Sequence, residues 1–139
     1  MNERHVQDVM TTDLVTCAPG TPIGEAARMM RDRDIGDVLV AEGDRLLGIV
    51  TDRDLVVRCL ADDAGPDSPI DTAFSPGPVT VGPGDSMDAA SQLMRDGALR
   101  RIPVVDDDRL VGIVSLGDLA LRADPDSALA DISAARPND

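Results

Sequence analysis

The chain has 139 residues, 42% of them hydrophobic, and a formal net charge of −13. This length suits one compact body, and the acidic charge disfavours partners with phosphate backbones or anionic lipid surfaces. No apolar run approaches the roughly 20 residues of a membrane span, and the first residues lack the basic stretch and apolar core of a signal peptide. We therefore expect a cytoplasmic protein that binds neither nucleic acid nor membrane.

The first half of the chain predicts a β-α-β-β-α series of elements. Apolar residues from Ile23 to Met30 recur at the spacing of one helical face. Two aliphatic runs on either side of a polar turn predict a β-hairpin, and the helix after it is expected to carry the apolar residues Leu55, Val56, Cys59 and Leu60. The predicted elements are an extended piece over 14–17, a helix from Ile23, strands over 38–41 and 46–50, and a helix that opens at Asp52.

The same elements return 64 residues later, without an insertion between Val9 and Leu55. Gly-Ile-Val-Thr at 48–51 reappears as Gly-Ile-Val-Ser at 112–115, and in each copy an Asp follows three positions after the hydroxyl residue. Such an offset indicates two copies of one unit. The second copy predicts an extended piece over 79–81, a helix from Met87, strands over 102–105 and 110–114, and a helix that opens at Leu116.

A unit of about 60 residues buries too little surface to be comfortably stable alone. We therefore predict an α/β (α+β) fold in which two β-α-β-β-α repeats pack with pseudo-twofold symmetry and leave a ligand cleft between them. The predicted boundaries are 6–62 for the first repeat, 63–70 for a polar Pro/Gly linker, 71–122 for the second repeat, and 123–139 for a tail with a short helix over 125–134.

The chain offers little for catalysis or metal binding. Cys17 and Cys59 do not correspond across the repeat and fit no metal motif, so free thiols and a redox-sensitive disulfide are both open interpretations. The sole histidine, His5, lies near the N-terminus. There is no His-containing constellation, no nucleophile beside a base and no Walker-type loop, so we expect no enzyme, no catalytic residue and no metal site.

The repeated hydroxyl and carboxylate, Thr51 with Asp54 and Ser115 with Asp118, lie where a strand ends and a helix begins. One interpretation is a capping box, which stabilises the helix by on the order of 1 kcal/mol and needs no ligand. The other is a binding site, because a helix start presents unpaired N–H groups to a phosphate while the carboxylate accepts from ribose hydroxyls. The two are compatible, since an empty site can cap itself.

At these residues the chain resembles a tandem pair of CBS (cystathionine-β-synthase) domains, often called a Bateman module. The resemblance covers residues 6–122 and rests on the opening Val-Met-Thr at 9–11, the order of helix and hairpin, and the Gly-hydrophobic-x-Thr/Ser-x-x-Asp motif in both copies. The chain is similar above all to short stand-alone bacterial two-CBS proteins of the hypoxic-response type.

The resemblance implies a regulatory module that binds AMP, ADP, ATP, NAD or S-adenosylmethionine, with or without Mg²⁺, between the repeats. No cofactor is obligatory. Asp54 and Asp118 would hold the ribose hydroxyls, and Thr51 and Ser115 would contact phosphate or ribose. Two threonines would lie beside the adenine, two aliphatic residues would form its apolar wall, and arginines would serve phosphates. The full set carried over is Thr16, Val38, Thr51, Arg53, Asp54, Thr80, Arg101, Ile102, Ser115 and Asp118.

The two copies are not equivalent at this motif. Gly36-Asp37 becomes Arg100-Arg101, and Arg53 becomes Gly117. Because the two copies are expected to face each other, the arginines before the second hairpin either serve a phosphate across the cleft or form a solvated face. The resemblance also implies a homodimer through helical faces and a protein target regulated in trans. The alternative is a structural or interaction protein that dimerises, binds a protein partner and takes no ligand.

Overall fold

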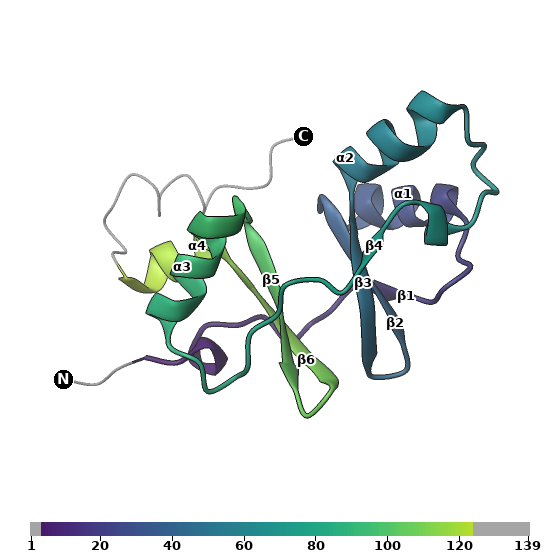
Figure 1. Cartoon of the computed structure of the whole chain (residues 1–139). Coiled ribbons are helices and arrows are strands. Elements are labelled where there is room, and N and C mark those ends of the chain that lie inside the picture. The colour runs from purple at the N-terminus through teal and green to yellow at the C-terminus, as the bar shows by residue number, and fades with distance from the viewer. Residues whose placement is uncertain (1–3, 124–139) are drawn as a thin grey trace. The chain divides into compact units, whose positions relative to one another are not determined.

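The computed structural model describes residues 4–123, which form two compact bodies (Figure 1). The first body runs from Val15 to Pro78, and the second combines residues 4–14 with residues 79–123. The predicted tail, with its helix over 125–134, lies outside the described residues except for Ala123. None of the helices between residues 4 and 123 combines the length and the hydropathy that a membrane span requires.

The first body contains a four-stranded sheet and flanking helices. In chain order its elements are β1 (Thr16–Cys17), α1 (Ile23–Arg33), β2 (Asp37–Glu42), β3 (Arg45–Thr51), α2 (Asp52–Asp54), η2 (Leu55–Cys59), η3 (Leu60–Asp62), η4 (Ile70–Thr72) and β4 (Ser75–Pro76). The sheet order is β1-β2-β3-β4, with β1 parallel to β2 and the other pairs antiparallel. α1 packs against β2 and buries Ala26 and Met30, as its apolar spacing predicts.

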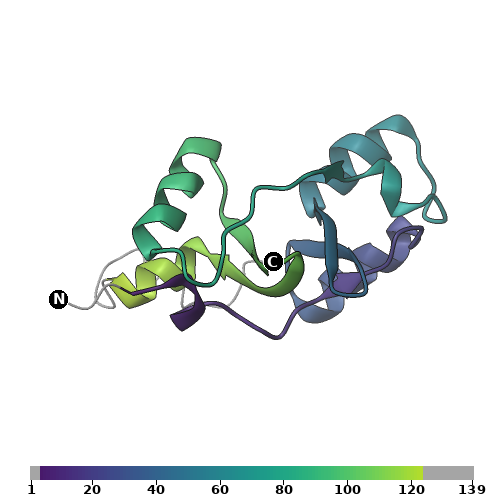
Figure 2. The ribbon, with the colours of Figure 1, turned by 60° about the horizontal axis from the view of Figure 1, so that its bottom comes forward.

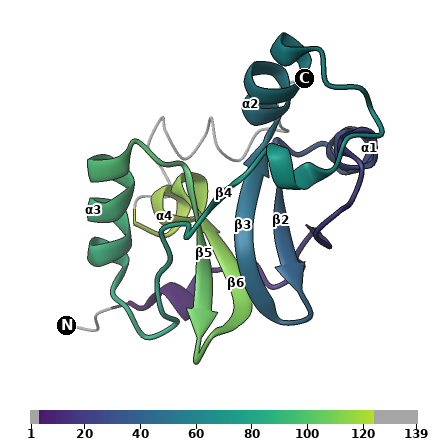
Figure 3. The same cartoon turned by 45° about the vertical axis from the view of Figure 1, so that its right-hand side comes forward.

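The second body repeats the plan with a smaller sheet. Its elements are η1 (Val6–Asp8), α3 (Met87–Gly97), β5 (Arg101–Asp106), β6 (Arg109–Ser115) and α4 (Leu116–Ala123). α3 packs against α4 and β5 (Figure 3). The extended piece predicted over 79–81 contributes one isolated parallel bridge, from Val81 to Val104, and is therefore shorter than a full strand.

The two hairpins match each other in register, and both were predicted from the sequence. Val38 lies opposite Val50 in the first body, and Ile102 lies opposite Val114 in the second. Both hairpins carry a β-bulge at the equivalent position. The repeat in the sequence is therefore a repeat in backbone geometry, and equivalent residues can be compared one to one.

The segment that leads into each repeat packs on the body of the other repeat. Residues 4–14 lie along the second body (Figure 2), where Thr11 and Ile113 exchange backbone hydrogen bonds of 2.8 and 3.0 Å. Reciprocally, β4 pairs with β3 of the first body, with Ser75 opposite Ile49. Ser75 and Ile49 are the 64-residue counterparts of Thr11 and Ile113, so the exchange is symmetrical. Each compact body therefore contains the main part of one sequence repeat together with the leading segment of the other.

This exchange explains the glycine of the repeated motif. A Cβ built on Gly112 would lie 2.6 Å from Sδ of Met10 and 3.1 Å from the carbonyl oxygen of Thr11. Real side chains do not tolerate such contacts, so only glycine lets the leading segment cross β6 this closely. In the second copy, the glycine of the motif is therefore required by packing.

The predicted linker over 63–70 is packed against α1. The carbonyl oxygens of Ser68 and Pro66 accept the N–H groups of Ile23 and Gly24, each at 2.9 Å. The residue before the helix, Pro22, has no side chain that can cap it, and the linker carbonyls satisfy donors at the helix start instead. The polar and Pro/Gly-rich composition of this segment gave no sign of this capping role.

The helix predicted after β3 is irregular, and its apolar residues divide between the core and the surface. It starts as α2, as expected at Asp52, but continues as a π-helix in η2 and a 3₁₀ turn in η3. Cys59 is fully buried, whereas Val56 is 55% and Leu60 68% exposed. A π turn closes its hydrogen bonds five residues apart, so α-helical spacing does not predict which of these side chains are buried.

Candidate functional site

Each repeat closes a pair of hydrogen bonds where its second helix begins. In the first repeat the Asp54 N–H donates to Thr51 Oγ1 at 3.0 Å, and the Thr51 N–H donates to Asp54 Oδ2 at 2.9 Å. In the second, the Asp118 N–H donates to Ser115 Oγ and the Ser115 N–H donates to Asp118 Oδ2, both at 3.0 Å. These are the predicted capping boxes, complete in both copies.

The boxes leave acceptor capacity on the carboxylates. Each uses Oδ2, and an ionised carboxylate has about four lone-pair positions on its two oxygens. Asp54 Oδ1 lies 3.9 Å from Nε of Arg58, and the Asp54 side chain is 26% exposed. A ligand hydroxyl can therefore still approach Asp54. The contact with Arg58 was missed in the sequence, although its i,i+4 spacing was a usable signal.

The residues just before each hairpin are fixed beside the motif by backbone hydrogen bonds. The Asp52 N–H donates to the carbonyl of Gly36 at 2.9 Å, and the Leu116 N–H donates to the carbonyl of Arg100 at 2.8 Å. We call each such set of residues a motif frame: 36–37 with 51–54 in the first repeat, and 100–101 with 115–118 in the second. The two frames have the same backbone connections.

The strand register places one charged residue next to each motif hydroxyl. Asp37 lies opposite Thr51 across β2 and β3, and Arg101 lies opposite Ser115 across β5 and β6. Directly opposite residues have Cβ atoms about 4.5–5.5 Å apart. The register therefore places Arg101 beside Ser115, which in turn shares two hydrogen bonds with Asp118.

The four residues predicted to contact adenine divide into an exposed pair and a buried pair. Thr16 and Thr80 are exposed, Thr16 on β1 opposite Leu39. Val38 and Ile102 are 1% and 0% exposed, and their side chains belong to the hydrophobic cores. An apolar wall at these two positions stays a prediction, because a ligand could reach their side chains only if the surrounding residues moved.

Arg53 is exposed on the short α2 helix. Its N–H donates to Oδ1 of Asp52 at 2.7 Å. The Asp52 carboxylate also lies over Gly36, where an added Cβ would be 3.3 Å from Asp52 Oδ2. Asp52 is thus a charged residue of the first motif frame that the predicted site did not include.

Both cysteines are free thiols in the first body, Cys17 half-buried and Cys59 buried. Burial raises the pKa of the Cys17 thiol, and a hydrogen bond with Thr21 offsets this only in part. Within residues 4–123 no group of His, Cys, Asp and Glu is arranged to hold a metal ion. Both cysteines are free thiols in the structure, which is the first of the two interpretations.

Comparisons with known proteins give the family. The CBS domain model matches residues 6–60 and again 66–123. The CBS domain-containing protein YhcV of Bacillus subtilis is 41% identical over 116 residues, which cover 84% of this chain and 83% of YhcV. Hypoxic response protein 1 of Mycobacterium tuberculosis is 31% identical over 116 residues, covering 82% of this chain and 81% of that protein.

Solved structures agree with the sequence relatives. The structure of CBSX2 in complex with AMP superimposes with a TM-score of 0.76 and 26% identity, and covers 86% of this chain and 95% of that one. Similarity of this extent reaches across both repeats, as do the two matches of the family model. The chain therefore belongs to the CBS domain family and carries two copies of the domain in tandem.

Proposed function

We propose that this CBS pair is a regulatory, non-catalytic sensor of an adenosine-containing nucleotide of the AMP, ADP or ATP class. The observation that carries the proposal is the matched pair of motif frames, in which a hydroxyl, a carboxylate and a helix start recur with the same hydrogen bonds. Binding of AMP by the related CBSX2 supports it. NAD and S-adenosylmethionine are further ligands of the same class.

Each group of the frame has a chemical role in this proposal. The carboxylates of Asp54 and Asp118 accept hydrogen bonds from the two ribose hydroxyls, since vicinal hydroxyls suit an acceptor-only group. Thr51 and Ser115 donate to a phosphate or ribose oxygen. Arg101 supplies positive charge next to Ser115. No bond is made or broken, so the residues need only bind and orient the ligand.

Calorimetric titration of AMP, ADP, ATP, NAD and S-adenosylmethionine, with and without Mg²⁺, tests the proposal. We expect saturable binding of at least one ligand, weakened in Asp54→Asn or Asp118→Asn. Asp67→Asn is the matched control, because it removes the same charge from the exposed linker. Unfolding midpoints of all variants show whether a loss of binding reflects a loss of fold. Flat titrations of all five ligands at millimolar concentration would contradict the proposal.

The alternative function, a structural or interaction protein without a ligand, has one observation in its favour. Both capping boxes are already complete without any ligand, so the motif has a sufficient structural role. It predicts that Asp54→Asn and Asp118→Asn change stability alone. Ligand-independent thermal unfolding in the presence of all five compounds would favour it.

A homodimer is part of the proposed function. Val56, Val57 and Leu60 are between 51% and 68% exposed on consecutive turns of η2 and η3, an apolar surface on one helical segment. We expect this surface to contribute to the dimer interface. Sedimentation of the wild type and of Val57→Asp measures it: the variant should be monomeric, and an unchanged dimer would exclude this segment. Affinity capture with this chain tests for the protein that it regulates in trans.

A further inference from the structure

Each motif strand is paired with the segment that leads into the other repeat. Strand β6 ends at Ser115, and Ile113, two residues earlier, pairs with β5 on one side and with Thr11 on the other. Two residues along a strand span roughly 7 Å, and their side chains lie on the same face of the sheet. The backbone of residues 4–14, the first leading segment, is therefore attached to β6 close to the motif hydroxyl.

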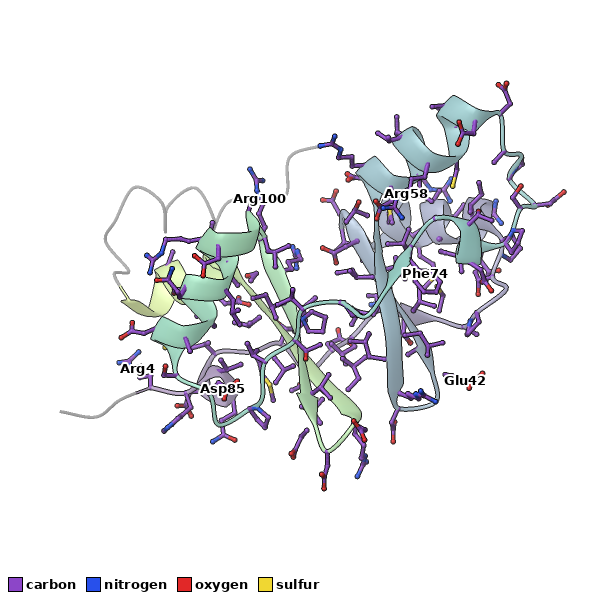
Figure 4. All side chains as sticks on the ribbon, viewed as in Figure 1. Arg4, Glu42, Arg58, Phe74, Asp85 and Arg100 are labelled. Carbon is purple, nitrogen blue, oxygen red and sulfur yellow. The ribbon has the colours of Figure 1, made fainter. Side chains whose placement is uncertain are left out.

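The first leading segment also shares a core with the helix that completes the motif. Val6 is fully buried and belongs to the same core cluster as Leu119, the residue of α4 that follows Asp118. The backbone holds Val6 in place, because its N–H donates to the carbonyl of Asp85 at 2.8 Å, beside η1 in Figure 4. The segment is thus joined to both elements that carry the motif, to β6 by hydrogen bonds and to α4 through the core.

Only three residues separate this attachment from the sheet of the first body. Thr11 is bonded to Ile113, and the carbonyl of Val15 accepts the N–H of Leu39 on β2 at 3.1 Å. The residues between them, 12–14, reach at most about 11 Å when fully extended. A tether this short limits how far Thr11 can move without moving the start of β1.

The second leading segment, the 64-residue counterpart at 68–78, is built in the same way on the first body. Ser75 lies opposite Ile49, which is two residues before the motif hydroxyl at the end of β3. Ile70 is fully buried, and Leu55, the first residue after the motif, packs against the same core. Each motif is therefore flanked by a leading segment that belongs, in sequence, to the other repeat.

Given the proposed function, on which this inference rests, we propose that the leading segments transmit the occupancy of each motif to the other repeat. A ligand held by Ser115 and Asp118 joins β6 to α4, and the first leading segment is attached to both. Such a ligand stabilises the attached state of the segment, and the tether carries the effect to β1. A ligand shifts this equilibrium only as far as it binds the attached state more tightly than the detached one.

Amide hydrogen exchange of the full chain, resolved by NMR, tests the link between motif and leading segment. The probe is AMP, ADP, ATP, NAD or S-adenosylmethionine, whichever the titration shows to bind most tightly. We expect saturating ligand to slow exchange in at least one of the two pairs, Thr11 with Ile113 or Ser75 with Ile49, by about fivefold beyond any change at Val104. Val104 is fully buried in β5 and calibrates the stabilisation of the whole fold.

The tether is tested in the ligand-free chain. Gln7→Pro removes the N–H that the carbonyl of Pro83 accepts at 3.0 Å, and so loosens the first leading segment without changing a motif residue. We expect the Leu39 amide, which donates to Val15, to exchange about fivefold faster. Gln7→Ala is the matched control, because it keeps the N–H and alters only an exposed side chain.

A longer tether separates transmission from a general loss of stability. A Gly/Ser insertion of about four residues after Thr12 gives the tether slack. In this background Gln7→Pro should no longer change the exchange of the Leu39 amide. The same insertion after Gly43, in the exposed turn of the first hairpin, should leave the effect of Gln7→Pro intact.

The outcomes separate this inference from the proposed function. Ligand binding with both pairs unchanged relative to Val104, or equal Leu39 exchange in Gln7→Pro and Gln7→Ala, would overturn the inference while the sensor function stands. An effect of Gln7→Pro that survives the longer tether would also overturn it. Absence of binding by all five compounds in the folded wild type would overturn both. Unfolding midpoints recorded for each variant exclude misfolding as the cause of faster exchange.

Discussion

The crossing of the leading segment over β6 makes Gly112 highly sensitive to an added side chain. Gly112→Ala would place a methyl group 2.6 Å from Met10 Sδ, 3.0 Å from Met10 Cγ and 3.1 Å from the Thr11 carbonyl oxygen. The sulfur can swing away, but the backbone carbonyl cannot move without disturbing the bridge to Ile113. The substitution should therefore detach the leading segment from the second body.

The size of the effect follows from what is lost. Two backbone hydrogen bonds join Thr11 and Ile113, and each contributes about 0.5–1.5 kcal/mol. Overpacking adds about 1–3 kcal/mol, and the stiffer unfolded chain of alanine returns about 0.4–1 kcal/mol. We expect the free energy of unfolding to fall by roughly 1–5.5 kcal/mol, a large fraction of the stability of a small domain.

Urea unfolding followed by far-ultraviolet circular dichroism measures this change, since the chain has no Trp or Tyr for fluorescence. Gly84→Ala is the matched control, because a Cβ there meets nothing within 4 Å. Hydrogen exchange of the Thr11 and Ile113 amides reports the bridge directly. A Gly112→Ala variant within about 0.5 kcal/mol of the wild type, with both amides still protected, would refute the argument.

Three further predictions concern local structure. Ala98 ends α3 with a φ of +52°, a left-handed conformation that favours glycine, so Ala98→Gly should raise the free energy of unfolding by about 0.5–1 kcal/mol in the same urea assay. Ser86 Oγ accepts the Ala89 N–H at 3.0 Å at the start of α3, so Ser86→Ala should cost about 1 kcal/mol, and no change would exclude a capping role. Burial raises the pKa of Cys17, so its thiolate fraction at pH 8 is below that of a free cysteine and iodoacetamide should react slowly until the pH exceeds the ordinary thiol value. Alkylation in the native protein as fast as in urea would contradict this. The same shift means that the contribution of Cys17 to stability is complete below its unfolded pKa and is lost as pH rises through the folded one.

Much of each repeat was predictable because the signals are local. The hairpins, the helices from Ile23 and Met87, and the helix starts at Asp52 and Leu116 all follow from apolar spacing and turn residues within a few positions. The capping boxes follow from a hydroxyl and a carboxylate three residues apart. These elements needed no knowledge of distant parts of the chain.

Other features depend on partners far away in the sequence. The π-helical turn at 55–59 is followed by the exposed Leu60 and leaves Val56 exposed, and the aliphatic Val38 and Ile102 lie in the cores. Arg58 and Asp52 could be assigned to the candidate site only from their contacts, Arg58 with Asp54 and Asp52 with Gly36. Propensity and spacing do not specify which neighbour a side chain meets.

The sequence by itself determined that the protein is a duplicated unit, that each unit has a hairpin followed by a capped helix, and that the two motifs differ in charge. These are properties of composition and of contacts over three or four residues. Only the tertiary structure decided that the leading segments are exchanged, that Gly112 is required by the crossing chain, and that Arg101 and Asp37 lie beside their motif hydroxyls. The reason is that strand register and chain crossing are fixed by packing across the whole body, which no local pattern encodes.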